Sequence, residues 1–249
     1  AAGKLFGLSE QQLIYAFGVS GSQAAGSLQF LVNGAWNKRY QVGAAAMNGV
    51  IAATLARNDF IGSSDSVEGK HGLLVGYTND PHPDKAVAGL GTTYETLKIG
   101  VKPYPSCRYT HAAIDALIAM RREHNLTPDQ IRKVEIGLHR NGITLTGDAA
   151  TKRHPTSVVG GQFSMFFTGA IALDQGHFGW DDYDRLGDKA IDALADKFDV
   201  VQDDRLEVGR THPFGARVSI TTDDGTHERL YADPSGEPTS FPNAQAMQQ

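Results

Sequence analysis

The sequence predicts an α+β protein in which a helical segment rich in small residues precedes a module of mixed helices and strands. Three observations lead to this. The first third of the chain has helical periodicity and much alanine and glycine. From about residue 98 the pattern changes to a strand, helix, strand order. Near the end, Asp224-Gly225 separates two alternating segments, which is a strong hairpin signal.

Two helices are expected in the first third. In the first, Ser9 is placed to cap the amino end, and Leu13, Ile14 and Phe17 share one face. The second covers residues 42–55, where a run of glycines and alanines would let another helix approach closely. Tight helix packing inside an all-helical layer is the simplest interpretation of these small residues.

The later elements follow from local patterns. Alternation marks strands, amphipathic spacing marks helices, and Thr127-Pro128 begins a turn. The elements expected are a strand at 94–101, a helix at 108–123, a turn at 127–130, a strand at 133–139, helices at 161–173 and 181–195, and a hairpin around 224–225.

Proline and glycine mark the boundaries. Pro81, Pro83 and two glycines separate the helical part, 1–88, from the α+β part, 89–234. Residues 235–249 have no periodicity and are expected to be a mobile tail or a truncated linker. The chain opens at Ala1 without an initiator methionine, so we expect it to be part of a longer chain.

Composition excludes several classes of protein. A chain of 249 residues with 41% hydrophobic residues can bury the core of one large domain or two small ones. A net charge of -5 argues against nucleic acid as a partner. Cys107 is the single cysteine and no zinc-site spacing occurs, so no metal is expected and the reducing cytoplasm is the simplest location. No apolar run approaches the roughly 20 residues that span a membrane.

The first candidate site is V-K-P-Y-P-S-C-R-Y-T-H, residues 101–111. Prolines bias Lys102 toward an extended backbone at a strand end, and a helix follows that carries His111 in its first turns. There His111 would stay neutral and exchange a proton near neutral pH. A lysine, a helix amino end and a histidine make a pocket for a carboxylate. Alternatively, Lys102 is a solvated charge, His111 a satisfied histidine and Cys107 a small buried hydrophobe.

Two further basic clusters stand before helices. Lys38 and Arg39, followed by Tyr40, precede the alanine-rich helix, where the helix dipole disfavours cations, so they would be held there for a bound anion. Arg153 precedes a loop at Gly160-Gly161-Gln162 whose amides can face a ligand. Surface loops with solvated charges are the alternative for both. No nucleotide-binding glycine motif is present, and the remaining histidines have no metal-site spacing.

Three motifs in order resemble one family. They are W-N-K-R-Y-Q-V-G-A-A-A-M-N-G, then K-P-Y-P-S-C-R-Y-T-H, then H-P-T-S-V-V-G-G-Q-F-S-M-F-F. The chain resembles the MmgE/PrpD family, which includes 2-methylcitrate dehydratases, cis-aconitate decarboxylases and iminodisuccinate epimerases, from residue 8 to about 233. The resemblance implies a large helical domain and a smaller α+β lid domain with the site between them, a homodimer, and no metal or organic cofactor.

The resemblance also implies site residues. Lys38 and Lys102 fall on lysines of the family motifs and His111 on a histidine of the following helix. This chain looks like the family's C-terminal portion without the usual N-terminal helical region, which would carry an acid and a histidine of the site or form a separate half. Cys107 stands where decarboxylases of the family have a histidine and Ile143 where they have a tyrosine, so cis-aconitate decarboxylation is less expected.

These observations predict a cofactor-free lyase that removes a proton next to a carboxylate of a small di- or tricarboxylic acid, by dehydration of a 2-methylcitrate-like hydroxy acid. Catalytic residues would be Lys38, Lys102 and His111. Substrate-binding residues would be Arg39, Tyr40, Cys107, Arg153 and Gln162. The alternatives are an epimerase of an iminodisuccinate-like acid, a non-catalytic half of a split enzyme, and a thiol-dependent hydrolase that uses Cys107 and His111.

Overall fold

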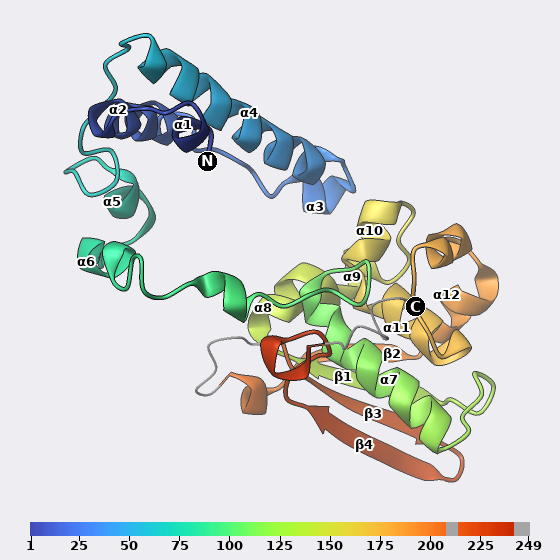
Figure 1. The fold of residues 1–249 in the computed structure, drawn as a ribbon. Coiled ribbons are helices and arrows are strands. Elements are labelled where there is room, and N and C mark those ends of the chain that lie inside the picture. Colours follow the sequence, from blue (N-terminus) through green and yellow to red (C-terminus); the bar gives the residue numbers. More distant parts are fainter. Residues whose placement is uncertain (208–213, 242–249) are drawn as a thin grey trace. The chain divides into compact units, whose positions relative to one another are not determined.

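The computed structural model describes residues 1–207 and 214–241 and contains both helices and a four-stranded sheet, so the predicted α+β class is confirmed (Figure 1). The chain forms two compact units. Unit 1 contains Ala1–Phe30 and Ala35–Tyr94, and unit 2 contains Leu31–Gly34 and Glu95–Gln249. Within the described residues, no helix has the length and apolar character needed to cross a membrane.

Helices form the regular structure described in unit 1. The Ser9 cap is confirmed: its Oγ accepts a hydrogen bond from the Gln12 amide at 3.3 Å, and the Gln12 side chain accepts one from the Ser9 amide at 3.1 Å. The helices are α1 (Ala2–Leu5), α2 (Glu10–Gly21), α4 (Asn37–Arg57), α5 (Leu73–Tyr77) and α6 (Pro83–Val87), with α3 (Phe30–Asn33) at the junction with unit 2.

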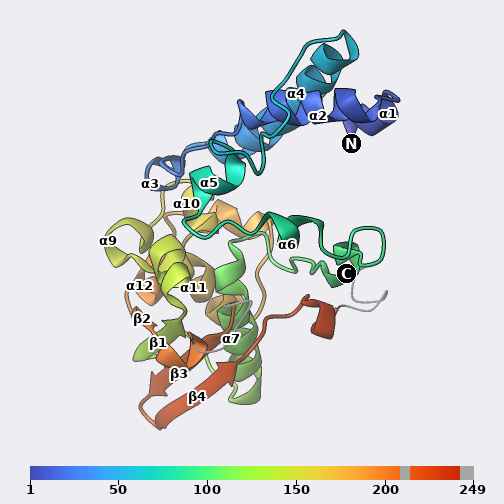
Figure 2. The same ribbon diagram turned by 90° about the vertical axis from the view of Figure 1, so that its left-hand side faces the viewer.

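The long helix α4 packs against α1 and α2 (Figure 2). Its buried residues are Ala52, Ala53 and Ala56, which agrees with close helix packing by small side chains. The earlier part of the same small-residue run is different, because a Cβ added at Gly43 or Gly49 would meet no atom within 4 Å. The predicted tight packing therefore holds for residues 52–56 and not at Gly43 or Gly49.

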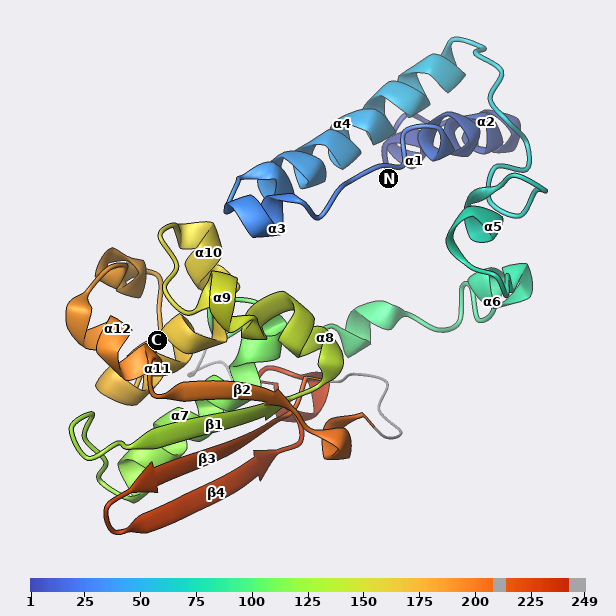
Figure 3. The same ribbon diagram turned by 180° about the vertical axis from the view of Figure 1, so that it is seen from behind.

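Unit 2 is built on a sheet of strand order β2-β1-β3-β4 (Figure 3). The central strand β1 (Lys133–Leu138) pairs in parallel with β2 (Phe198–Gln202) and antiparallel with β3 (Ala216–Thr222), which pairs with β4 (Gly225–Tyr231). The hairpin at Asp224-Gly225 is confirmed, with Gly225 at a φ of 140°. Strand β2 was not predicted.

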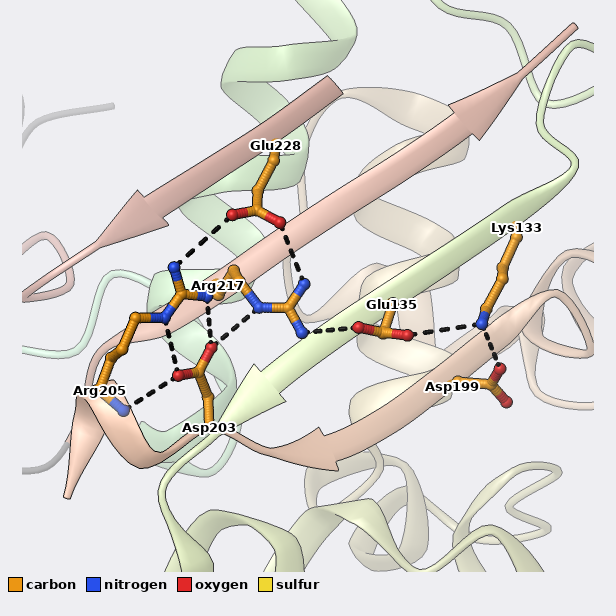
Figure 4. Close-up of polar contacts among 7 residues, drawn as sticks. All are labelled: Lys133, Glu135, Asp199, Asp203, Arg205, Arg217 and Glu228. Carbon is orange, nitrogen blue, oxygen red and sulfur yellow. Dashed lines mark hydrogen bonds and ion pairs between the residues drawn. The ribbon is translucent and has the colours of Figure 1, made fainter. Parts of the chain in front are cut away.

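The two faces of this sheet differ in chemistry. On one face Val134, Ile136, Val218 and Ile220 are fully buried in a core that also contains side chains of α7 (His111–Glu123) and α11 (Met165–Gln175). The opposite face carries a cluster of charged residues on all four strands and the loop after β2 (Figure 4). Burial of one face alone is typical of such a layered arrangement.

Several predicted elements are wrong in detail. Residues 94–101 form a short 3-10 helix, η1 (Glu95–Lys98), and pair with no strand of the described residues. The helix expected at 161–173 is interrupted before Ser164, whose Oγ accepts from the Phe167 amide at 2.9 Å and caps α11. The helix expected at 181–195 is interrupted at Gly187, which has a φ of 79°.

Short helices complete unit 2. They are η2 (Arg108–Thr110), α8 (Arg140–Gly142), the π-helical η3 (Ile143–Gly147), α9 (Ala149–Lys152), α10 (Val158–Gln162), η4 (Asp181–Arg185), α12 (Lys189–Ala195), η5 (Asp204–Leu206) and η6 (Pro238–Ser240). The helix expected at 108–123 is confirmed as η2 followed by α7.

Candidate active site

The segment around Lys102 leads from η1 into η2 without forming a strand, so the predicted strand end is wrong. Lys102 is exposed, whereas Ser106 and Cys107 are buried. The Lys102 Nζ donates to the carbonyl oxygen of Ser106 at 3.1 Å. An exposed lysine is thus attached to a buried part of its own segment.

His111 lies directly behind this lysine at the start of α7. Arg108 Nη1 lies 3.1 Å from His111 Nδ1, and His111 Nε2 lies 3.4 Å from the Ser106 carbonyl oxygen. A guanidinium can only donate, so Nδ1 is the acceptor and the ring proton is on Nε2, which points to Ser106. Ser106 therefore accepts from both Lys102 and His111.

The environment of His111 keeps its ring neutral. The side chain is fully buried, and this burial, together with the positive charges of Arg108 and Lys102, lowers the pKa of His111 to about 3, although the Ser106 carbonyl opposes the shift. The neutral ring agrees with the prediction from the sequence. The expected proton exchange near neutral pH disagrees with the structure, because burial and the nearby cations lower the pKa of His111 far below neutral pH.

Cys107 and Gln162 lie side by side. The Cys107 amide donates to the Gln162 carbonyl oxygen at 2.8 Å, and the Cys107 side chain packs with Val159 and Phe163. The partners given above for both ring nitrogens of His111 do not include the thiol. The histidine is therefore not placed as a base for Cys107, and the thiol-dependent hydrolase loses its support.

Arg153 has a structural role that the sequence did not indicate. Its Nη1 donates to the carbonyl oxygens of Ala195 and Phe198 at 2.9 and 2.8 Å, and the guanidinium lies 4.6 Å from the ring centroid of Phe166. These contacts connect the end of α12 to the start of β2. The guanidinium of Arg153 is thus engaged by unit 2 itself, and its role in substrate binding stays a prediction.

Lys152, one residue earlier, was missed. It is 7% exposed, and its Nζ donates to the Leu31 carbonyl oxygen at 2.9 Å. Burial lowers the pKa of Lys152, while nearby Asp148 and Cys107 oppose this shift. A buried lysine with a perturbed pKa is a candidate functional residue. No local signal distinguishes it from Arg153, because only the tertiary packing decides that Lys152 reaches Leu31 and Arg153 reaches Ala195 and Phe198.

The other basic cluster belongs to unit 1. Lys38 and Arg39 lie inside the first turn of α4, and not before the helix as predicted. The guanidinium of Arg39 lies 4.9 Å from the Trp36 ring centroid. Trp36 provides no side-chain cap, and the first turn has no acidic residue. An anion at this end of the helix stays a prediction from the sequence.

Tyr40 lines a cavity within unit 1. The cavity has a volume of about 430 Å³, and its lining includes Gln23, Asn37 and Asn48 as well as the alanines of α4. Tyr40 is 71% exposed. Amide side chains beside a tyrosine can hydrogen-bond a polar ligand, so Tyr40 stays a candidate for substrate binding.

The segment after Pro234 is packed where a mobile tail was expected. Val101 donates its amide hydrogen to the Gly236 carbonyl oxygen at 2.8 Å, and Arg108 forms an ion pair with Glu237. The prediction is therefore corrected for residues 235–241, because backbone and charged side chains hold them against the Lys102 segment. Residues 242–249 of the predicted tail lie outside the described residues.

The fold and these side chains define an α+β protein with a helical unit and lysines suited to carboxylate groups. The chain belongs to the MmgE/PrpD family: residues 1–86 match the MmgE/PrpD N-terminal domain and residues 104–245 match the C-terminal domain. The prediction that the N-terminal helical region is absent was not borne out, since residues 1–86 match that domain.

Curated relatives are similar to this chain at modest identity. A cis-aconitate decarboxylase-like protein (oryM) of Aspergillus oryzae is 29% identical over 95% of this chain and 52% of its own length. Two cis-aconitate decarboxylases of Aspergillus terreus are 28% and 30% identical, each over 70% of this chain and 37% of their own length. The chain thus spans about half the length of the first relative and less of the other two.

Proposed function

We propose that this chain belongs to a lyase that acts on a small di- or tricarboxylic acid by removing a proton next to a carboxylate. The observation that carries the proposal is Lys102, an exposed ammonium attached through the Ser106 carbonyl to a buried arginine and histidine. Membership of the MmgE/PrpD family and relatives named as cis-aconitate decarboxylases support a lyase of this class.

In the proposed mechanism, Lys38 and Lys102 bind substrate carboxylates. Removing an α-proton builds negative charge on the adjacent carboxylate, and ammonium groups already aimed at that charge stabilise the transition state more than the ground state. The pKa of His111, lowered to about 3, makes its neutral ring a weak base, so we propose that His111 helps to hold Lys102 and that a different group removes the proton. We also propose a homodimer in the cytoplasm, as the family resemblance implies.

Dehydration and epimerisation share the same carbanion-like intermediate, whereas decarboxylation forms its carbanion by losing CO₂. Loss of a β-hydroxyl as water gives a dehydratase for a 2-methylcitrate-like acid, which remains our first proposal. Return of the proton on the opposite face gives an epimerase. Decarboxylation, in which a C–C bond breaks to release CO₂ and carbon takes up a proton, is favoured by the names of the relatives. Ile143 packs against the core of unit 2 and Cys107 is buried, so neither provides the polar group that the resemblance leads us to expect of a decarboxylase.

Proton NMR of the chain with 2-methylcitrate, citrate, cis-aconitate and iminodisuccinate in D₂O tests these alternatives together. A new vinylic signal indicates dehydration, loss of a carboxylate indicates decarboxylation, and deuterium at the α-carbon without other change indicates epimerisation. Lys38→Ala and Lys102→Ala should each lower turnover by roughly 10²-fold, as expected when a preorganised electrostatic donor is removed.

Lys133→Ala is the matched control for the lysine variants. Lys133 is half-exposed and lies on the charged face of the sheet, where it pairs with Asp199 and Glu135. Its removal should leave turnover unchanged. Near-normal turnover in both Lys38→Ala and Lys102→Ala would exclude the two lysines from the reaction.

A second candidate function is that of a non-catalytic half of a split enzyme. It is favoured by the apolar side chains that α4 and its start expose: Trp36 and Val42 are 71% and 70% exposed, and Met47 is 55% exposed. Such a surface on a soluble chain marks a site of association. Poor solubility of the chain alone, and recovery on adding a helical partner, would favour this candidate over a second copy of the same chain.

A further inference from the structure

Residues 234–241, here named the C-terminal strap, lie against the segment that carries Lys102 (Figure 1). The Ser235 amide donates to Asp115 Oδ2 at 2.7 Å, and the other oxygen of Asp115 accepts from the Tyr104 hydroxyl at 2.6 Å. The strap turns back on itself, since the Gly236 amide donates to the Ser240 carbonyl at 3.2 Å. The strap and Tyr104 therefore share one carboxylate of α7.

Gly236 makes this approach possible. Its φ is 85°, and a Cβ at this position would lie 2.2 Å from the Val101 carbonyl oxygen. Residues with side chains rarely adopt this backbone conformation, and a Cβ atom does not approach a carbonyl oxygen as closely as 2.2 Å. The strap can therefore lie against Val101 in this way only with glycine at position 236.

Arg108 joins the strap to the candidate site. Its Nε donates to Glu237 Oε1 at 3.0 Å, and its Nη1 lies 3.1 Å from each of the Val101 oxygen, the Ser235 oxygen and His111 Nδ1. The side chains of Arg108 and Glu237 are only 12% and 16% exposed. A planar guanidinium suits such a junction, because its donors point in fixed directions.

The contacts continue from Arg108 to Lys102. Arg108 fixes the tautomer of His111, and the Nε2 proton faces the Ser106 oxygen that also accepts from the Lys102 ammonium. The groups packed around the His111 ring are Arg108, Lys102 and Tyr104, whose ring centroid lies 5.3 Å away in an edge-on arrangement. A lysine on a flexible stem gains orientation from such support.

We propose that Arg108 and Glu237 are positioning residues for Lys102 and act through His111 and the Ser106 carbonyl, so that the C-terminal strap is part of the carboxylate site. This inference rests on the proposed function insofar as Lys102 binds a substrate carboxylate. Neither residue touches the substrate. Their effect is to hold the ammonium where charge develops, and a misplacement of about 1 Å can cost about 10²-fold in rate.

The test combines the ring ¹⁵N signals of His111 with turnover of the acids named above. All nine histidines are labelled with ¹⁵N. The ring signals that disappear in the variant His111→Gln are those of His111. In the wild type the two ring nitrogens should give widely separated signals of a single neutral tautomer. In Glu237→Gln the loosened Arg108 should allow both tautomers, so the two signals converge, and turnover should fall by up to about 10²-fold.

Two further variants separate positioning from stability. Gly236→Ala displaces the strap without changing any charge, so the His111 signals should converge and turnover should fall as in Glu237→Gln. Glu237→Asp keeps the charge, so its His111 signals and its turnover should lie between those of Glu237→Gln and the wild type. Glu228→Gln is the matched control, because Glu228 also pairs with a nearly buried arginine, Arg217, at 3.3 Å but has no connection to Lys102. It should leave the His111 signals and the turnover unchanged.

The results distinguish this inference from the proposed function. One outcome is that the wild type turns over none of the acids while the His111 signals of the variant Glu237→Gln converge. The proposed reaction then fails, and the connection from Glu237 through Arg108 to His111 stands. If the wild type is active, and Glu237→Gln folds with the signals and turnover of the wild type, the positioning role is wrong and the reaction stands. The inference is also overturned if Glu237→Gln loses no more turnover than the control Glu228→Gln and its His111 ring signals are those of the wild type.

Discussion

Two arginines in unit 2 have almost the same exposure and different surroundings. The side chains of Arg217 and Arg108 are 11% and 12% exposed. Arg217 lies on the charged face of the sheet and reaches three carboxylates, those of Asp203 at 2.8 Å, Glu135 at 2.6 Å and Glu228 at 3.3 Å (Figure 4). Arg108 reaches one carboxylate, and its Nη1 is directed to two backbone oxygens and a histidine nitrogen.

The comparison separates an arginine that holds a sheet together from one that acts on its neighbours. The three carboxylates around Arg217 come from β1, from β4 and from the loop after β2, so this cation crosslinks the sheet and its charge is more than balanced. Among the described residues a single carboxylate, that of Glu237, pairs with Arg108, and the positive charge of Arg108 helps to lower the pKa of His111. The same guanidinium group therefore stabilises the sheet at Arg217 and orients neighbouring side chains at Arg108.

Arg217→Met should have the largest effect on stability. It leaves Asp203, Glu135 and Glu228 with the more exposed cations Arg205 and Lys133 as partners, and removal of one partner from a largely buried ion pair costs about 3 kcal/mol. Urea unfolding followed by circular dichroism measures the change in the free energy of unfolding. The control Ser219→Ala, two residues along β3 on the same face, should change this free energy by no more than about 0.5 kcal/mol. An equally small effect of Arg217→Met would show that Arg205 and Lys133 alone are enough to balance these carboxylates.

Acid should destabilise the protein in two steps that correspond to the two arginines. The pKa of His111 is about 3 in the folded state, below its ordinary value near 6.5, so the unfolded state binds more protons between these values. Stability should therefore fall as the pH is lowered from about 6.5, by at most about 1.4 kcal/mol per pH unit. His111→Gln should remove this upper step. A wild-type protein whose urea midpoint is constant from about pH 6.5 to 4.5 would contradict the buried neutral ring.

The lower step belongs to the Arg217 cluster. Arg205 and Arg217 hold the pKa of Asp203 below its usual range, and Arg217 does the same for Glu135. Carboxylates with lowered pKa values stabilise the folded state above their ordinary pKa, near 4, and this contribution is lost as the pH falls further. Arg217→Met should flatten the decline in stability below about pH 4.5 and leave the upper step intact.

Lys133→Ala should have the smallest effect of these changes. Its ammonium lies 3.2 Å from Asp199 and 3.4 Å from Glu135 at the edge of the same cluster, but its side chain is 51% exposed. Solvent and salt screen such a pair, so the urea midpoint should not change measurably. A clear loss would mean that the whole cluster acts as one cooperative network and would weaken the contrast between Arg217 and its neighbours.

Local patterns predicted much of the fold. The Ser9 cap, the amphipathic helix after Arg108 and the hairpin at Asp224-Gly225 each depend on residues a few positions apart, and each was confirmed. Strand β2 was missed, since its burial alternates only weakly and its parallel pairing with β1 joins residues far apart in the sequence. For the candidate site, the sequence correctly selected the segment from Lys102 to His111 but not the environment of its side chains.

The sequence by itself determined the family, the α+β class, and the lysine and histidine spacing of the candidate site, because those properties are written in short motifs. Only the tertiary structure decided the surroundings of these side chains. Arg153 donates to carbonyl oxygens of unit 2, and Lys152 is buried. His111 is buried beside Arg108, and Arg108 in turn pairs with Glu237. The physical reason is that burial and charge partners often come from distant segments: Arg108 and Glu237 are 129 residues apart, and Lys152 and Leu31 are 121 apart. No local spacing encodes which carbonyl oxygens each of the two neighbouring cations, Lys152 and Arg153, will reach.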